Sequence, residues 1–510
     1  MHELLLRRRL LGCRTIAAAL TAVVSATCLP LAVARTDGQL KLTVVDAASG
    51  EPMPVRLELR DARNRLARLK PPGTVVAGDG VYFSGDVLLE LRRGRYSLLL
   101  EAGPEYQTFF TQPGTLEIVR GADDAKEIAM TRRVDMHEEG WYAGDLDVQS
   151  PDAGLDVVMA ARGVDVAPRT VVANRAGKCE ESRGAPAAGQ LTAALDQRRG
   201  GGLLFVSAES PVDVCQWKDA ESTMAALQAG RDAGAVTIAR QASAWDLPLW
   251  VAGGQLDAVQ ILHAATPKRR GDEHPVVRPL DRTFFPGKEG PGRYAESIYH
   301  RLLECGLRIT PAAGTAAGET NQPLGANRVY VHCGEQFTPD EWLGGLRSGA
   351  VVVTNGPLLR PLVQGQPPGA VFHLPAGTQH SFQIGLNLAF YAQTHIEYLE
   401  IVKNGSVLHT VRLDELAQAG GKLPEVPFDG SGWFLVRAVT DATDRYEYAT
   451  SGAWFVEQDY QPRISRTAAE YFLTWLDDLS REFADDANLQ ADVAAARPFW
   501  EDLRSRANAD

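Results

Sequence analysis

The sequence predicts a multidomain protein of the β and α/β classes, with an N-terminal β-sandwich, a barrel-like α/β domain and a C-terminal β-rich domain with a helical tail. Its 510 residues are too many for one hydrophobic core. Short strands with alternating apolar residues fill positions 35–134, and strands alternate with helices over positions 138–320. Strands return over positions 325–460, and an apolar helical stripe marks positions 461–510.

Residues 1–34 have the three parts of a secretory signal peptide. A basic stretch at Arg7–Arg9 precedes an apolar run that ends in Ala32-Val33-Ala34, the pattern of a cleavage site. An uncleaved N-terminal anchor is the alternative. No later stretch has the roughly 20 apolar residues that a membrane span requires. We therefore expect an exported protein, periplasmic or extracellular, with no membrane span in the mature chain.

The net charge and the cysteine content indicate which partners and which disulfides to expect. The formal net charge is −12, and no basic stripe is present, so we expect no nucleic-acid partner. Two of the six cysteines lie in the signal segment. In an oxidising compartment the other four can form one or two disulfides, and no C-x-x-C spacing indicates structural zinc. The sequence does not assign the pairing among these residues, which are Cys179, Cys215, Cys305 and Cys333.

The N-terminal region consists of strand-length segments separated by turn residues, as at Asp46–Gly50. This pattern predicts a small β-sandwich and resembles the carboxypeptidase-regulatory-like modules that precede exported enzymes. The expected strands are Leu40–Val45, Val55–Leu59, Val87–Leu91 and Tyr96–Leu100.

In the middle region, Gly202–Ser207 is almost continuously apolar, which is typical of a parallel sheet covered by helices on both faces. Successive βα units of this kind predict a barrel-like domain. The expected strands are Arg169–Ala173, Gly202–Ser207, Gly234–Ala239 and Leu256–Leu262. The expected helices are Asp156–Arg162, Leu191–Gln197, Ser222–Ala233 and Tyr294–Cys305.

Two capping boxes indicate where helices begin in the C-terminal part. Thr338-Pro-Asp-Glu341 is expected to begin a short helix, and Thr467-Ala-Ala-Glu470 a longer one. The second helix has one apolar face, which predicts core packing. That face comprises Phe472, Trp475, Leu476, Leu479 and Phe483. The expected strands of this region are Val351–Thr354, Phe382–Leu388, Ile396–Val402 and Trp433–Val439.

Several segments resemble one family of hydrolases. Gly140–Gln149 is similar to its opening strand, and Ile298–Ile309 and Val353–Arg360 match later parts of its pattern. The family is the polymerase-and-histidinol-phosphatase (PHP) type of metal-dependent hydrolase, in its carbaryl-hydrolase-like (CehA/McbA-like) branch. The resemblance implies a distorted seven-stranded β/α barrel flanked by β-domains. It also implies metals at the barrel mouth that activate water for attack on a phosphoester, amide or carbamate.

The metal-ligand positions of that family are altered in this chain. A His-x-His pair on one strand face, ready to share a metal, falls on Asp147 and Gln149. The family's Glu-Lys pair falls on Arg240 and Gln241. A further family histidine falls on Ala265, although a small change of alignment places His263 there instead.

Two functions are therefore open. The first is a pseudoenzyme that keeps the fold as a binding or envelope scaffold, with no cofactor, no assigned catalytic residue, and an unknown small molecule or envelope glycan as partner. The second is a hydrolase with a rebuilt, carboxylate-rich site for a calcium- or magnesium-like ion. Its candidate ligands are Asp145, Asp147 and His263, joined by Glu209 and Asp213. Asp145 has a structural alternative, a hydrogen bond to a loop amide. The number of missing ligands favours the pseudoenzyme.

Overall fold

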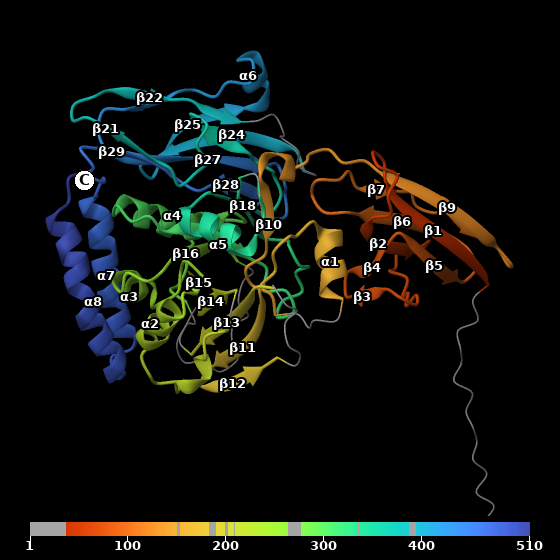
Figure 1. The fold of residues 1–510 in the computed structure, drawn as a ribbon, viewed down its shortest axis with the longest axis horizontal. Helices are drawn as coiled ribbons and strands as arrows, with labels where there is room; N and C mark the ends of the chain where they lie inside the picture. The colour runs from red at the N-terminus through yellow and green to blue at the C-terminus, as the bar shows by residue number, and fades with distance from the viewer. Residues whose placement is uncertain are drawn as a thin grey trace, which may run out of the picture.

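A computed structural model describes residues 37–149, 154–182, 190–198, 202–208, 210–263, 277–334, 336–386 and 394–510. The expected signal peptide and two of the positions singled out above, Glu209 and Ala265, lie outside these residues. Figure 1 shows an N-terminal β-unit at the right, an α/β unit below the centre, a second β-rich unit at the top and a helical pair at the left.

The N-terminal unit consists of two sheets that enclose one apolar core, as expected. One sheet has the order β5-β1-β9, and the other has the order β3-β4-β2-β6-β7, with β8 also paired to β6. In β1, alternate residues such as Leu40, Leu42 and Val44 are buried in the core between the sheets. The strands are β1 (Gly38–Asp46), β2 (Pro54–Asp61), β3 (Val75–Ala77), β4 (Gly80–Ser84), β5 (Asp86–Leu91), β6 (Gly94–Glu101), β7 (Phe109–Phe110), β8 (Leu116–Ile118) and β9 (Asp123–Met130).

The middle unit contains a seven-stranded sheet with the order β12-β11-β13-β14-β15-β16-β17. Its strands are β11 (Arg169–Arg175), β12 (Lys178–Glu181), β13 (Thr192–Gln197), β14 (Leu203–Ser207), β15 (Val236–Ala239), β16 (Ala258–His263) and β17 (Thr310–Gly314). Its helices are α1 (Leu155–Arg162), α2 (Met224–Asp232), α3 (Leu247–Ala252) and α4 (Gly290–Glu304), with short 3-10 turns η1 (His137–Glu139) and η2 (Val214–Gln216). A disulfide joins Cys179 of β12 to Cys215 of η2, while Cys305 and Cys333 are free thiols.

Two expectations for this unit were wrong. Leu191–Gln197 is not a helix, because Thr192–Gln197 forms strand β13 and every residue of it is buried in the sheet. Leucine and alanine favour helices locally, but tertiary packing overrides that preference. Strand β14 is antiparallel to both neighbours, so its apolar run does not indicate a parallel sheet. The run is apolar because Phe205 and Leu204 enter separate cores on opposite faces.

Residues 145–149 connect the two ends of this sheet. On one side, Leu146 N donates to Ala313 O over 3.2 Å and Gln149 N donates to Ala317 O over 2.7 Å. On the other side, Thr170 N donates to Val148 O over 2.9 Å. The segment therefore lies between the β17 end and the β11 end, and the sheet curves round to meet itself.

The C-terminal unit is built on a nine-stranded sheet that includes β10 (Trp141–Gly144) from earlier in the chain. The path is β10-β18-β19-β28-β27-β24-β25, and β29 pairs with both β27 and β21. Because β10 continues directly into the 145–149 segment, it ties this sheet to the middle unit. The remaining strands are β18 (Arg328–His332), β19 (Val351–Thr354), β20 (Pro361–Val363), β21 (Val371–Leu374), β22 (His380–Phe382), β23 (Ile384–Leu386), β24 (Ile396–Lys403), β25 (Ser406–Arg412), β26 (Val426–Phe428), β27 (Gly432–Thr440), β28 (Tyr448–Ser451) and β29 (Trp454–Gln458).

The helices of the C-terminal part are α5 (Pro339–Ser348), α6 (Leu413–Gln418), α7 (Arg466–Glu482) and α8 (Ala487–Ser505). Thr338 caps α5 as expected, accepting from Glu341 N at 3.1 Å. The cap of α7 is Ser465, two residues before the expected Thr467. Helices α7 and α8 lie along the middle unit in Figure 1, and Trp500 Nε1 donates to Pro248 O of α3 at 3.0 Å. The tail thus shares the apolar core of the middle unit.

No helix in the described part of the chain is long and apolar enough to cross a membrane.

Candidate functional site

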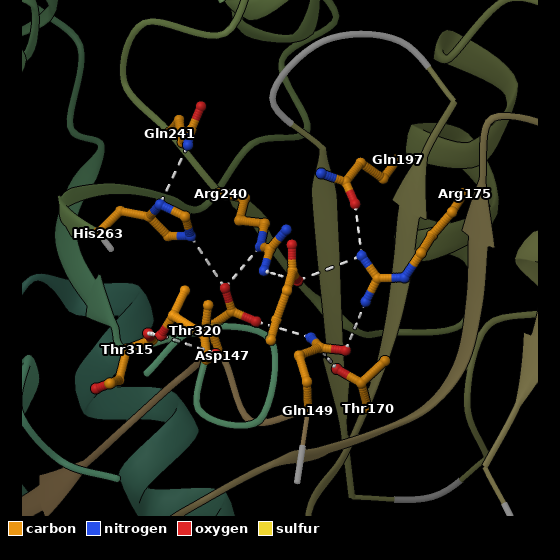
Figure 2. A network of polar contacts seen from close by, with 12 residues as sticks. Asp147, Gln149, Thr170, Arg175, Gln197, Arg240, Gln241, His263, Thr315 and Thr320 are labelled. Atoms are coloured by element: carbon orange, nitrogen blue, oxygen red, sulfur yellow. Dashed lines mark hydrogen bonds and ion pairs between the residues drawn. The ribbon is translucent and has the colours of Figure 1, made fainter. Parts of the chain in front are cut away.

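Polar side chains meet where several strands of the middle unit end. Strands β15, β16 and β17 are mutually parallel, so the residues at their carboxyl ends lie at one edge of the sheet. Arg240 follows β15 directly, and His263 is the last residue of β16. Glu319 follows β17, while Asp147 comes from the 145–149 segment beside it. Figure 2 shows the resulting network.

Asp147 is the centre of this network and has no solvent-exposed surface. Its Oδ2 accepts from Arg240 Nε at 2.6 Å and lies 3.1 Å from His263 Nε2. Its Oδ1 accepts from Gln149 Nε2 at 2.8 Å. Burial raises the pKa of this carboxyl, but the Arg240 charge and the His263 contact outweigh it and hold the pKa well below its usual value. Asp147 is therefore ionised in the folded protein.

Arg240 brings a permanent positive charge to the position between two carboxylates. Its Nη2 donates to Glu319 Oε2 at 2.6 Å, in addition to the Asp147 contact, and its side chain is fully buried. Burial lowers the pKa of the guanidinium, but Asp147 and Glu319 reverse that effect and raise it. Nη1 of Arg240 has no hydrogen-bond partner among the described residues.

A second arginine extends the network toward β11. Arg175 Nη1 lies 2.7 Å from Gln197 Oε1 and 3.3 Å from Glu319 Oε2, while Nη2 donates to Gln149 Oε1 at 3.0 Å. Gln149 also donates to Thr170 Oγ1 at 2.8 Å. Gln149 is therefore held as a bridge between Asp147 and Arg175.

His263 is positioned as a neutral donor. Its Nδ1 lies 3.2 Å from Gln241 Nε2, and an amide nitrogen donates. The ring proton therefore belongs on Nε2, which faces Asp147. Burial lowers the pKa of this imidazole, so the ring is uncharged near neutral pH. Asp147 and His263 are the two candidate ligands that the fold brings together.

Asp145 joins this network only through the backbone, because its Oδ1 accepts from Asp147 N at 3.3 Å, and it touches neither Arg240 nor His263 in the described chain. Its Oδ1 accepts from Thr315 N at 2.9 Å, and its Oδ2 accepts from Gly325 N at 2.8 Å. Burial raises its pKa to about 6, and these hydrogen bonds offset only part of that effect. The loop-amide role considered from the sequence is the one observed.

Asp213 is also separate from the network. It caps η2 by accepting from Cys215 N at 3.0 Å, and no contact joins it to Asp147 within the described residues.

The donor set does not fit the divalent cation that the sequence resemblance implies. A metal at Asp147 Oδ2 would lie beside the Arg240 guanidinium, which repels it, and would displace the protonated Nε2 of His263. Within the described ranges, no group of three or more His, Cys, Asp or Glu side chains is arranged to hold a metal ion. From the sequence, Arg240 was named only as a position where the Glu-Lys pair implied by the resemblance is lost. Glu319 and Arg175 were not expected here, because they lie in a loop and on a strand with no motif to mark them.

A cavity of about 950 Å³ opens above this network. His263, Gln241 and Gln260 form part of its lining on the side of the middle unit. The N-terminal unit contributes Glu101 from the end of β6, and the C-terminal unit contributes Tyr448 of β28. The cavity therefore lies where the three units meet.

Comparisons with known proteins give no relative that explains this site. No protein-family model matches the chain, and no curated protein matches it. Fibronectin(III)-like modules of CbhA from Clostridium thermocellum are 14% identical over 20% of this chain and 98% of their own, with a TM-score of 0.14. The N-terminal four Ig domains of Dscam1 isoform 8.4 are 9% identical over 83% of this chain and 100% of their own, with a TM-score of 0.14. Such low TM-scores support no inference about fold or activity.

Proposed function

We propose that this chain is an exported, non-catalytic relative of the PHP, carbaryl-hydrolase-like proteins, which uses its barrel mouth to bind a small molecule or envelope glycan. The observation that carries the proposal is the buried Arg240 guanidinium, which lies 2.6 Å from both Asp147 and Glu319. In the family that the sequence resembles, metal ions carry the positive charge at the barrel mouth. Here a side chain of the protein carries it.

Electrostatics support this substitution. Arg240 is permanently charged, so it neutralises Asp147 without any bound ion. Removing one partner of a buried ion pair costs roughly 3–5 kcal/mol, and a metal that displaced the guanidinium would have to offset that loss. A metal ion would also need an oxygen of Asp147 as a ligand, whereas both oxygens of Asp147 already accept hydrogen bonds.

The second candidate is an active hydrolase with a rebuilt site. The contact that favours it is the 3.1 Å approach of His263 Nε2 to Asp147 Oδ2, because an imidazole oriented by a carboxylate can act as a general base. His263 also lines the cavity. Against this role, its Nδ1 faces an amide donor, so the proton on Nε2 points at Asp147 and neither nitrogen is free to take a proton from substrate.

A hydrolysis assay on the mature chain separates the two candidates. Zinc, manganese, magnesium and calcium are supplied one at a time, with p-nitrophenyl phosphate, an anilide and an aryl carbamate as substrates. We expect turnover equal to the protein-free blank, with the Asp147→Ala and His263→Ala variants indistinguishable from wild type. Metal-dependent turnover that disappears in either variant would contradict the proposal and favour the hydrolase.

A further inference from the structure

The cavity over the barrel mouth contains a buried amide without a partner. Gln260 of β16 is 1% exposed and lines the cavity. Neither Nε2 nor Oε1 of its amide has a hydrogen-bond partner among the described residues. Buried polar groups nearly always have partners, so an amide that reaches a cavity in this state indicates a ligand that supplies both an acceptor and a donor.

The position of this amide is restricted by the backbone beneath it. A Cβ on Gly314 would lie 2.7 Å from Gln260 Nε2 and 2.6 Å from the Cβ of Asp147. The glutamine therefore packs directly on the Gly314 backbone next to the ion-pair network. The absence of a side chain at Gly314 is what allows the amide to occupy this place.

A second unpartnered group comes from β28 of the C-terminal unit. Tyr448 is fully buried and lines the cavity, and its hydroxyl has no partner in the described chain. Its ring is stacked on Tyr446 with centroids 4.3 Å apart, which fixes where the hydroxyl points. A phenol that is both donor and acceptor thus adds to the glutamine amide.

The charged groups of the lining are already engaged. Arg162 contacts Glu101 at 3.6 Å, and Arg445 forms an ion pair with Glu447. Arg328 donates to the Gly325 carbonyl at 2.8 Å. Lys288 donates to a backbone carbonyl as well. An anionic ligand would find few free cationic donors and would face the carboxylates of the same wall, so this lining favours an uncharged ligand.

The aromatic groups of the lining do not favour a flat aromatic ligand. One face of Tyr446 is covered by Tyr448 and its ring also has the Arg293 guanidinium 4.8 Å from its centroid. Recognition of a nucleobase usually includes stacking on an exposed ring face. A saturated ligand with several hydroxyl groups has no such requirement.

We infer that the cavity binds a neutral polyhydroxylated molecule, a carbohydrate, through the Gln260 amide and the Tyr448 hydroxyl. Adjacent sugar hydroxyls supply a donor and an acceptor together, which is what a planar amide needs. The cavity volume lies within the range of small-molecule sites, roughly 300–1,000 Å³. This inference rests on the proposed function, in which the barrel mouth binds without hydrolysing, and it names the class of ligand.

The test uses the mature chain and defined probes in saturation-transfer NMR and calorimetry. The neutral probes are glucose, galactose, N-acetylglucosamine, maltose and trehalose, and the comparison probes are glucose 6-phosphate and adenosine. Gln260→Met keeps the length of the side chain but removes both hydrogen-bonding atoms, and Tyr448→Phe removes only the hydroxyl. Gln255→Met, a surface glutamine that donates to Gln228, is the matched control.

We expect at least one neutral sugar to bind, with affinity reduced about tenfold or more by Gln260→Met and several-fold by Tyr448→Phe, and unchanged by Gln255→Met. If Gln260→Met fails to fold, Tyr448→Phe decides. Absence of binding by every neutral sugar, or sugar binding that neither cavity variant weakens, would overturn the inference. Exclusive binding of glucose 6-phosphate or adenosine would overturn the ligand class. All three results would leave the proposed function standing, whereas metal-dependent turnover would overturn the proposed function itself.

Discussion

Nε of Arg240 lies 2.6 Å from Oδ2 of Asp147, and neither side chain has any solvent-exposed surface. The two residues are far apart in sequence, in a segment that closes the sheet and in the loop after β15. In a buried pair of this kind, removal of either side chain leaves the charge of the other uncompensated in the interior. The pairing also means that the charge of Asp147 is balanced by the protein's own side chains.

Removal of the guanidinium is expected to destabilise the fold strongly. Arg240→Gln leaves Asp147 fully buried without its countercharge, while the half-buried Glu319 keeps only its 3.3 Å contact with Arg175. The loss should cost roughly 3–5 kcal/mol in the free energy of unfolding. Urea denaturation followed by fluorescence measures the change. In the double variant with Asp147→Asn, the two losses should not add, because both substitutions remove the same contact. Full additivity would show that the pair is not coupled.

Gly314→Ala is expected to lower the unfolding temperature, because the new Cβ would lie 2.6 Å from Asp147 Cβ and 2.7 Å from the Gln260 amide. Differential scanning fluorimetry measures the shift. Gly344→Ala is the matched control, since Gly344 lies in α5 with nothing within 4 Å of the added Cβ. That control should be neutral or stabilising by up to about 1 kcal/mol. Equal effects of the two substitutions would argue against close packing at Gly314.

The titration of Asp145 is expected to make the free energy of unfolding depend on pH. Burial raises the pKa of this carboxyl from its ordinary value of 3.8 to about 6. Between these two values the folded chain binds more protons than the unfolded chain, so this residue makes stability fall as pH rises from 4 to 6. The full effect is on the order of 3 kcal/mol.

Asp145→Asn removes that titration. At pH 4 the wild-type carboxyl is protonated, but its hydroxyl oxygen can still accept weakly, whereas the amide NH2 of asparagine can only donate and would face a backbone N–H. The variant should therefore be less stable than wild type at this pH. The difference between the two proteins should then shrink toward pH 7. Thermal unfolding at pH 4, 5, 6 and 7 gives the comparison. A difference that is constant over this range would contradict the raised pKa.

The thiols of the mature chain are expected to react in two classes. Alkylation of the unfolded, unreduced protein should label Cys305 and Cys333 only, and prior reduction should add Cys179 and Cys215. Peptide mass spectrometry identifies the labelled positions. Because the disulfide closes a loop with a sequence separation of 36, its loss should cost about 3–4 kcal/mol. Labelling of all four residues without reduction would show that the bond does not form.

The local sequence pattern correctly predicted the strands in which buried and exposed residues alternate. The four strands expected in the N-terminal unit are present as β1, β2, β5 and β6. The helix after Thr338 is also present, because its cap is a local interaction. Segment Leu191–Gln197 was misassigned because its leucine and alanine residues favour a helix, whereas its neighbours in the sheet make it a strand.

The candidate site was only partly predictable. The resemblance indicated five altered positions, with His263 as a further candidate ligand. Ala265 lies outside the described residues, whereas Asp147, Gln149, Arg240, Gln241 and His263 do meet in the fold. The resemblance gave no reason to expect that Arg240 bonds directly to Asp147. Glu319 and Arg175 complete the network, but only tertiary contacts bring them there, 79 residues from Arg240 and 26 from Gln149 respectively. No local pattern encodes such contacts.

The metal content of the mature protein, purified without chelator, tests the central claim most directly. Plasma mass spectrometry on wild type and on Asp147→Ala gives the number of metal ions per chain. We expect background metal in both, because the Arg240 guanidinium supplies the charge that Asp147 requires. Near-stoichiometric metal in wild type that disappears in Asp147→Ala would contradict this interpretation.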